Sequence, residues 1–245
     1  MVAHPAGEVV MGLLSGVWAW FTDPANWQGP DGVPTRVVEH LRIAGVALLL
    51  AVVIAVPVGI VLGRSGRGGF LAFSVGNVGR AIPTFALLFI FASWETVGVG
   101  DLAAMLALVL FAIPPLLTNT YVGLREVDVD VKDSALGLGM TSWQRLRRVE
   151  LPLSVPLVAA GLRTTTVQVV ATATLAAFVG GGGLGRYIVD GFGQQDTVLI
   201  TCGVILVALL CMATEGAMAL AQRAATPPPL REPSGEQRRE RASAA

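Results

Sequence analysis

A run of twenty consecutive uncharged residues, IAGVALLLAVVIAVPVGIVL at positions 43–62, limits most strongly how this chain can fold. As an α-helix the run would be about 30 Å long, which is the thickness of the hydrocarbon core of a bilayer. Four further stretches are also long and apolar enough to cross, at residues 70–93, 102–124, 156–179 and 197–220. The sequence therefore predicts an all-α, polytopic membrane protein with about five transmembrane helices.

The two ends of the chain differ from the spans. Residues 9–21 are apolar but too short to cross, and they contain three clustered aromatic residues, so we expect an interfacial helix there. Residues 23–39 are rich in Pro, Gly and Asp, which is typical of an external loop. The sequence thus divides into an external segment 1–40, one transmembrane domain 41–222 with a cytosolic loop 125–155, and a disordered, proline-rich cytosolic tail 223–245.

The basic residues indicate the orientation in the cell (inner) membrane. Most of the seventeen lie on one side of the predicted spans, and only Arg36, Arg42 and Arg186 lie on the other. Because Lys and Arg are retained in the cytosol during insertion, we expect the N-terminus outside and the C-terminus inside. The formal net charge is zero, so nothing points to a nucleic-acid partner.

Residues 133–152, DSALGLGMTSWQRLRRVELP, form a basic, amphipathic segment between two spans. Gly139 is placed to end a first short helix in a left-handed conformation. Thr141 and Gln144 fit a capping box that begins a second short helix, which Pro152 is expected to stop. The alternative is an ordinary amphipathic loop that lies on anionic lipid headgroups.

The spacing of this segment resembles the signature of ABC importer permeases, E-A-A, three residues, G, nine residues, I-x-L-P. Asp133 and Ser134 stand where Glu and Ala are usual, and Ala135, Gly139 and Pro152 match. Four other runs are similar to osmoprotectant permeases: NVGRAIPTFALL at 77–88, IPPLLTNTYVGLREVD at 113–128, GLRTT at 161–165 and GGGGLG at 180–185. The resemblance covers about residues 41–220. It implies a type I ABC importer fold and a cargo such as glycine betaine, choline, carnitine or proline betaine.

The resemblance also implies partners. The bent segment would dock on a cytosolic ABC ATPase through Asp133, Ser134, Ala135, Leu136, Gly137, Gly139, Met140, Trp143 and Pro152. A substrate-binding protein outside the membrane and a second permease, either a copy or a homologous chain, would complete the importer. The chain has a single lysine, Lys132, and no phosphate-binding G-x-x-x-x-G-K-[ST] motif, so ATP hydrolysis is assigned to a separate subunit.

Polar residues within the spans are the candidates for a cargo path. Thr165, Gln168 and Thr172 share one helical face, and the other candidates are Asn77, Thr84 and Asn119. Each has an alternative role in packing, since Thr can bond to its own helix and Asn or Gln can join helices. We expect no cofactor and no metal site, with His40 a solvated surface histidine.

Two other functions stay open from the residues alone. One is the permease of an ABC importer for methionine or other amino acids. The other is an ion-coupled secondary transporter, which should show acidic residues in the middle of a span, and none is visible. A membrane enzyme would need paired His or Asp residues at helical spacing, and these are also missing from the sequence.

Overall fold

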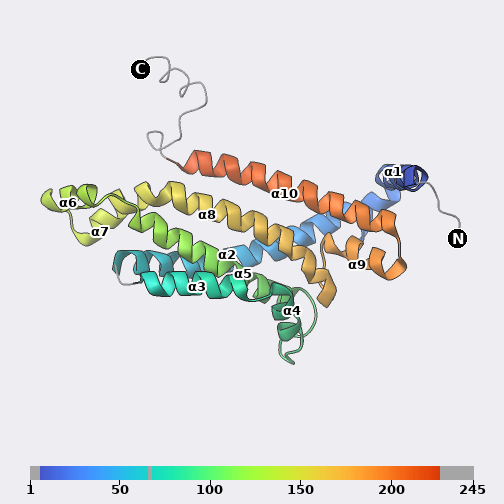
Figure 1. Ribbon diagram of the computed structural model, residues 1–245, viewed down its shortest axis with the longest axis horizontal. Helices are drawn as coiled ribbons and strands as arrows, with labels where there is room; N and C mark the ends of the chain where they lie inside the picture. Colours follow the sequence, from blue (N-terminus) through green and yellow to red (C-terminus); the bar gives the residue numbers. More distant parts are fainter. Residues whose placement is uncertain (1–5, 66–67, 227–245) are drawn as a thin grey trace, which may run out of the picture.

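The computed structural model describes residues 6–65 and 68–226, and over these residues it is an elongated bundle of helices (Figure 1). Most of the predicted disordered tail, residues 227–245, lies outside the described part of the chain. Four helical runs are long and apolar enough to span a membrane. They are α2 (Val33–Ser65), α5 (Asp101–Arg125), the run Ser142–Val179 that contains α8 (Leu151–Thr172), and α10 (Thr197–Ala225).

The predicted span 70–93 is a pair of helices, α3 (Gly69–Ala81) and α4 (Thr84–Ala92), which meet at 80°. Pro83 explains the break, because its ring lacks an N–H and clashes with the preceding turn. Ile82 before it is extended, with φ −76° and ψ 120°, as a residue that precedes proline prefers. Counted as one broken span, the pair brings the total to five, which confirms the predicted helical membrane architecture.

The two ends of the bundle carry different short elements (Figure 1). At one end lie α6 (Val129–Gly137) and α7 (Ser142–Arg145), together with the C-terminal end of α10; we call this the α6 end. At the other end, the α9 end, lie α1 (Ala6–Thr22), α9 (Gly185–Gln194) and the 3-10 segment η3 (Ala173–Val179).

The external loop predicted at residues 23–39 is shorter in the structure, because its last seven residues belong to a helix. A short 3-10 helix η1 (Pro24–Trp27) lies within it, and α2 already begins at Val33. Pro34 is tolerated in the first turn of α2 because the N–H groups there have no partner within the helix. Helix α2 therefore extends past its apolar run, and its first turns carry polar side chains beyond the span.

Helices α2 and α5 pack closely through a stripe of small residues. Every fourth residue of α2 on the contact face is buried, and after Ile43 these are Ala47, Ala51, Ala55, Gly59 and Gly63. A Cβ atom on Gly59 would lie only 2.7 Å from Cβ of Thr120 on α5. Within lipid, helices associate through such close van der Waals contact rather than through the hydrophobic effect. The small side chains therefore set the distance between the two central helices.

Gly59→Leu should separate α2 from α5 and lower the stability of the protein by about 1–3 kcal/mol, the usual cost of overpacking. The measurement is the thermal unfolding midpoint in detergent. Gly45→Leu is the matched control, because Gly45 is exposed on the same helix and a Cβ there meets nothing within 4 Å. Equal midpoints for the two variants would contradict this account of the contact.

Candidate functional site

The α6–α7 element has the bent shape that the sequence predicts. Gly139 adopts φ +76°, and the N–H of Met140 donates back to the carbonyl of Ala135 at 3.1 Å. The Thr141 hydroxyl accepts from the Gln144 N–H at 3.3 Å, while the Gln144 side chain accepts from the Thr141 N–H at 2.9 Å. This is the reciprocal capping box that begins α7. Local chemistry alone therefore fixes the bend.

The apolar side chains at the bend point away from the bundle. Leu136, Leu138 and Trp143 are 49%, 78% and 63% exposed. Asp133, Ser134, Gly137 and Gly139 are also exposed, Met140 is half-buried, and Ala135 is buried. A Cβ atom on either glycine would meet nothing within 4 Å. Large apolar groups gathered in the open are typical of a surface that another protein covers.

Pro152 does not stop the second short helix, contrary to the prediction. A π-helical turn η2 (Leu146–Glu150) joins α7 to α8, and Pro152 lies in the first turn of α8. The Leu151 N–H donates to the carbonyl of Leu146, which is the wider π spacing. Proline costs little at a helix start, where no N–H partner is lost. The bent element is thus continuous with α8.

Glu150 attaches the bent element to the end of α2. Its side chain is only 5% exposed; Oε1 accepts from Nε of Arg145 at 2.7 Å, and Oε2 lies 3.2 Å from Nε of Arg64. Arg64 also donates to the carbonyl of Ser142 at 2.9 Å. The only sequence signal for this cluster is one acidic residue that follows three arginines. A buried carboxylate held by two guanidinium groups is costly to unpair, so the cluster fixes the angle of the element.

Glu150→Gln should loosen residues 142–150, because it removes two charge-assisted contacts of about 1.5–3 kcal/mol each. We expect amide hydrogen exchange in this segment to accelerate roughly tenfold or more. Glu126→Gln is the control, since Glu126 is exposed at the end of α5 and takes part in none of these contacts. Unchanged exchange in Glu150→Gln would show that the cluster does not hold the element.

The six predicted cargo-path residues lie in different surroundings. Thr84 lines an apolar cavity of about 370 Å³ between α3, α4 and α5, whereas Gln168 lines a polar cavity of about 420 Å³ between α8 and α10. Thr165 is buried and donates to the carbonyl of Gly161 at 2.8 Å, and Asn119 packs against Gly161 and donates to Pro115. Thr172 is half-buried, and Asn77 is exposed. Of the six predicted residues, therefore, only Thr84 and Gln168 line one of these two cavities.

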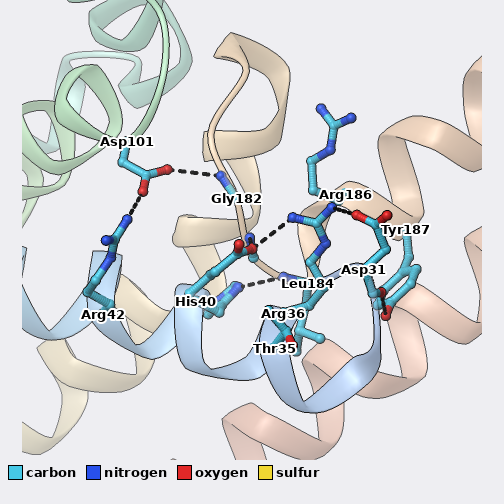
Figure 2. Close-up of polar contacts among 12 residues, drawn as sticks. Asp31, Thr35, Arg36, His40, Arg42, Asp101, Gly182, Leu184, Arg186 and Tyr187 are labelled. Carbon is cyan, nitrogen blue, oxygen red and sulfur yellow. Dashed lines mark hydrogen bonds and ion pairs between the residues drawn. The ribbon is translucent and has the colours of Figure 1, made fainter. Parts of the chain in front are cut away.

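At the α9 end the glycine run 180–185 is held by side chains of α2 and α5 (Figure 2). Asp101 accepts from the Gly182 N–H at 2.9 Å, and Glu39 accepts from the Gly183 N–H at 2.9 Å. Gly180 and Gly183 have φ +79° and +94°, which only glycine adopts without strain. The N–H groups of Gly182, Gly183 and Leu184 are therefore all paired with side chains of α2 and α5.

His40 is buried, so the expectation of a solvated surface histidine is wrong. Its Nε2 lies 2.8 Å from the carbonyl of Val170 on α8, and its Nδ1 lies 3.3 Å from the N–H of Leu184. Because a carbonyl can only accept, Nε2 carries the proton and Nδ1 accepts, which defines a neutral imidazole. His40 therefore joins α2, α8 and the glycine run.

Charged neighbours complete this cluster (Figure 2). Arg36 pairs with Asp31 and Glu39, and Arg42 pairs with Asp101. The Tyr187 hydroxyl donates to the carbonyl of Asp31 at 2.7 Å. Burial raises the pKa of Tyr187 to about 12, so this hydroxyl keeps its proton at neutral pH. The α9 end thus presents a rigid surface.

His40→Leu should leave the Leu184 N–H and the Val170 carbonyl without partners, at about 1–3 kcal/mol for each buried group. We expect a lower unfolding midpoint in detergent. The control is Val38→Leu, because Val38 is 66% exposed on the same stretch of α2. A His40→Leu protein as stable as the control would refute the bridging role.

The fold and these two ends define a helical, multi-pass membrane permease. Residues 55–226 match the family described as binding-protein-dependent transport system inner membrane component, and the chain belongs to this family. It is therefore an inner-membrane component of a transport system.

Several curated proteins are similar along most of their length. The chain is 37% identical to the glycine betaine/carnitine/choline transport system permease protein OpuCB of Bacillus subtilis (strain 168), over 77% of this chain and 86% of that protein. It is 38% identical to the choline transport system permease protein OpuBB of the same organism, over 78% and 88%. It is also 38% identical to the carnitine transport permease protein OpuCB of Listeria monocytogenes, over 79% and 88%.

Solved structures confirm the fold. The MetNI methionine ABC transporter in an inward-facing conformation is similar with a TM-score of 0.69 and 23% identity, over 84% of this chain and 100% of that chain. A crystal structure of an amino acid ABC transporter with histidines gives a TM-score of 0.64 and 13% identity, over 91% and 100%. The type I ABC importer fold is therefore confirmed, and the family favours an ABC importer over an ion-coupled secondary transporter.

Proposed function

We propose that this chain is the permease subunit of an ATP-driven importer for osmoprotectants of the glycine betaine, carnitine and choline class. The observation that carries the proposal is the identity of 37–38% to permeases named for these compounds, over more than three quarters of the chain. The fold alone does not select a cargo, because a transporter for a different compound, methionine, has a similar fold at only 23% identity.

The bent α6–α7 element is the docking surface for a cytosolic ABC ATPase in this proposal. Its exposed Leu136, Leu138 and Trp143 supply apolar contact area, and its two glycines leave room for a partner backbone. Its continuity with α8 and the Glu150 cluster would carry ATPase movements into α8 and α2. ATP is hydrolysed on the partner subunit.

The α9 end faces the outside in the same proposal, with the N-terminus external and the C-terminus cytosolic. Helix α1 lies in the membrane interface, as its clustered aromatic residues favour. The fixed glycine run offers a preformed surface to a substrate-binding protein, so that little ordering is needed on binding. A second permease, identical or homologous, encloses the cargo path.

Reconstitution of the permease with its ATPase and its binding protein in vesicles tests this function directly. Labelled glycine betaine, choline and methionine are offered with and without ATP. We expect uptake of the first two, and only when ATP and both partners are present. Uptake of methionine alone would overturn the cargo class, and uptake driven by a sodium or proton gradient without the ATPase would overturn the energy source.

Gly137→Trp should reduce uptake by roughly tenfold or more, because a large side chain would stand on the docking surface. Gly137 lies at the helical end of α6 with open space around it, so the fold itself can accept the change. Gly139 is a poorer site for this test, since its φ of +76° strains any side chain.

Gly137→Ala is the matched control and should retain uptake, while both variants insert into the membrane equally. Copurification of the ATPase subunit provides the second measurement, and it should fall only in Gly137→Trp. Normal uptake and normal copurification in that variant would contradict docking at this element.

A further inference from the structure

Arg163 on α8 and Glu215 on α10 form an ion pair between two membrane-spanning helices. Nε of Arg163 donates to Oε1 of Glu215 at 2.8 Å, Nη2 donates to the same oxygen, and Nη1 donates to the Gln222 side chain at 3.2 Å. Arg163 lies seven residues after the start of the predicted span 156–179 and Glu215 five residues before the end of the predicted span 197–220, about 10 Å and about 8 Å along the helix. Charges in hydrocarbon are costly, so the pair must face water or protein.

The ion pair opens onto the polar cavity of about 420 Å³ between α8 and α10. The Arg163 and Glu215 side chains keep 35% and 43% of their surface exposed. The remaining lining residues are Ala160, Thr164, Val167, Gln168 and Gln222. This volume lies in the usual range of small-ligand sites.

The face of α8 along this cavity carries few large apolar side chains. Ala160, Thr164 and Gln168 follow one another at four-residue spacing, and all are small or polar. The exposed side chains of α10 include the large apolar Leu209 and Met212, which suit lipid. Polar and ionisable groups within spans are typical of substrate pathways.

We infer that this cavity binds zwitterionic quaternary ammonium cargo, with its carboxylate on Arg163 and its ammonium facing Glu215. The inference rests on the proposed function and assigns a selectivity site within it. A guanidinium group binds a carboxylate through two parallel hydrogen bonds. A quaternary ammonium cannot donate a hydrogen bond, and Glu215 offers it charge alone; no aromatic side chain lines the cavity among the described residues.

Bound cargo would exchange one ion pair for two. Its carboxylate replaces Glu215 on the Arg163 guanidinium, and the released Glu215 carboxylate faces the ammonium group. With a zwitterionic cargo the cavity stays neutral when empty and when occupied, so no uncompensated charge is left away from water at either stage.

The two charges have different consequences for selectivity. Glycine betaine and carnitine carry a carboxylate, whereas choline carries a hydroxyl group in its place. Arg163 therefore acts on the zwitterions alone, and Glu215 acts on every cargo with a quaternary ammonium.

Uptake of glycine betaine and choline by the reconstituted importer tests this assignment, with the same loaded binding protein in saturating amount for each variant. Arg163→Gln should lower the ratio of betaine to choline uptake by about tenfold, the loss expected for one charged hydrogen-bonded contact. Glu215→Gln should lower both rates and leave the ratio unchanged. Arg223→Gln is the matched control, because Arg223 is exposed near the end of α10 and does not line the cavity.

If the ion pair has only a structural role, betaine and choline uptake should fall together in Arg163→Gln. An unchanged ratio of betaine to choline uptake in this variant would therefore overturn the inference. If that variant fails to insert, Thr164→Trp fills the cavity instead and should stop both uptakes while the ATPase still copurifies; normal uptake would again overturn it. A wild type that imports neither compound would overturn the proposed function, which is a different result from a wild type that imports both.

Discussion

The close contact of α2 with α5 is the interaction on which both ends of this permease depend. Lipid gives two apolar helices no hydrophobic reason to associate, so their distance must come from shape. The small residues at every fourth position of α2, such as Gly59 against Thr120, supply that shape. At its α9 end α2 carries Glu39 and His40, and at its α6 end it carries Arg64. One rigid helix thus positions the contacts at both ends.

Helix α8 is joined to this central pair at two points. The Glu150 cluster holds the beginning of α8 to Arg64, and near the other end His40 donates to the carbonyl of Val170. Helix α8 is also continuous with the bent element through η2. In the proposed importer, a push on α6 and α7 would therefore move α2 and α8 together, relative to α10, and change the width of the cavity between α8 and α10.

The features that could be predicted from sequence depend on neighbouring residues. Apolar runs define the spans, and the bend at Gly139 and the capping box at Thr141 follow from side chains within a few positions. The effect of a proline depends on its position relative to a helical turn. Pro83 breaks the helix, whereas Pro152 lies in the first turn of α8 and leaves the helix continuous. The roles of His40 and Glu150 could not be predicted, because their partners lie far away in the sequence. The small-residue stripe of α2 is visible in the sequence, but only the contact with α5 gives it meaning.

The same reasoning explains why Arg163 and Glu215 are tolerated within two predicted spans. Each charge alone would oppose insertion, whereas the pair is neutral and hydrogen-bonded across α8 and α10. An ion pair whose side chains are 35% and 43% exposed contributes little to stability. Stability does not require this charge pair, and the pair is exposed to a polar cavity beside Gln168. The best explanation is that both charges are needed at that place. A cargo that carries one positive and one negative charge supplies that need.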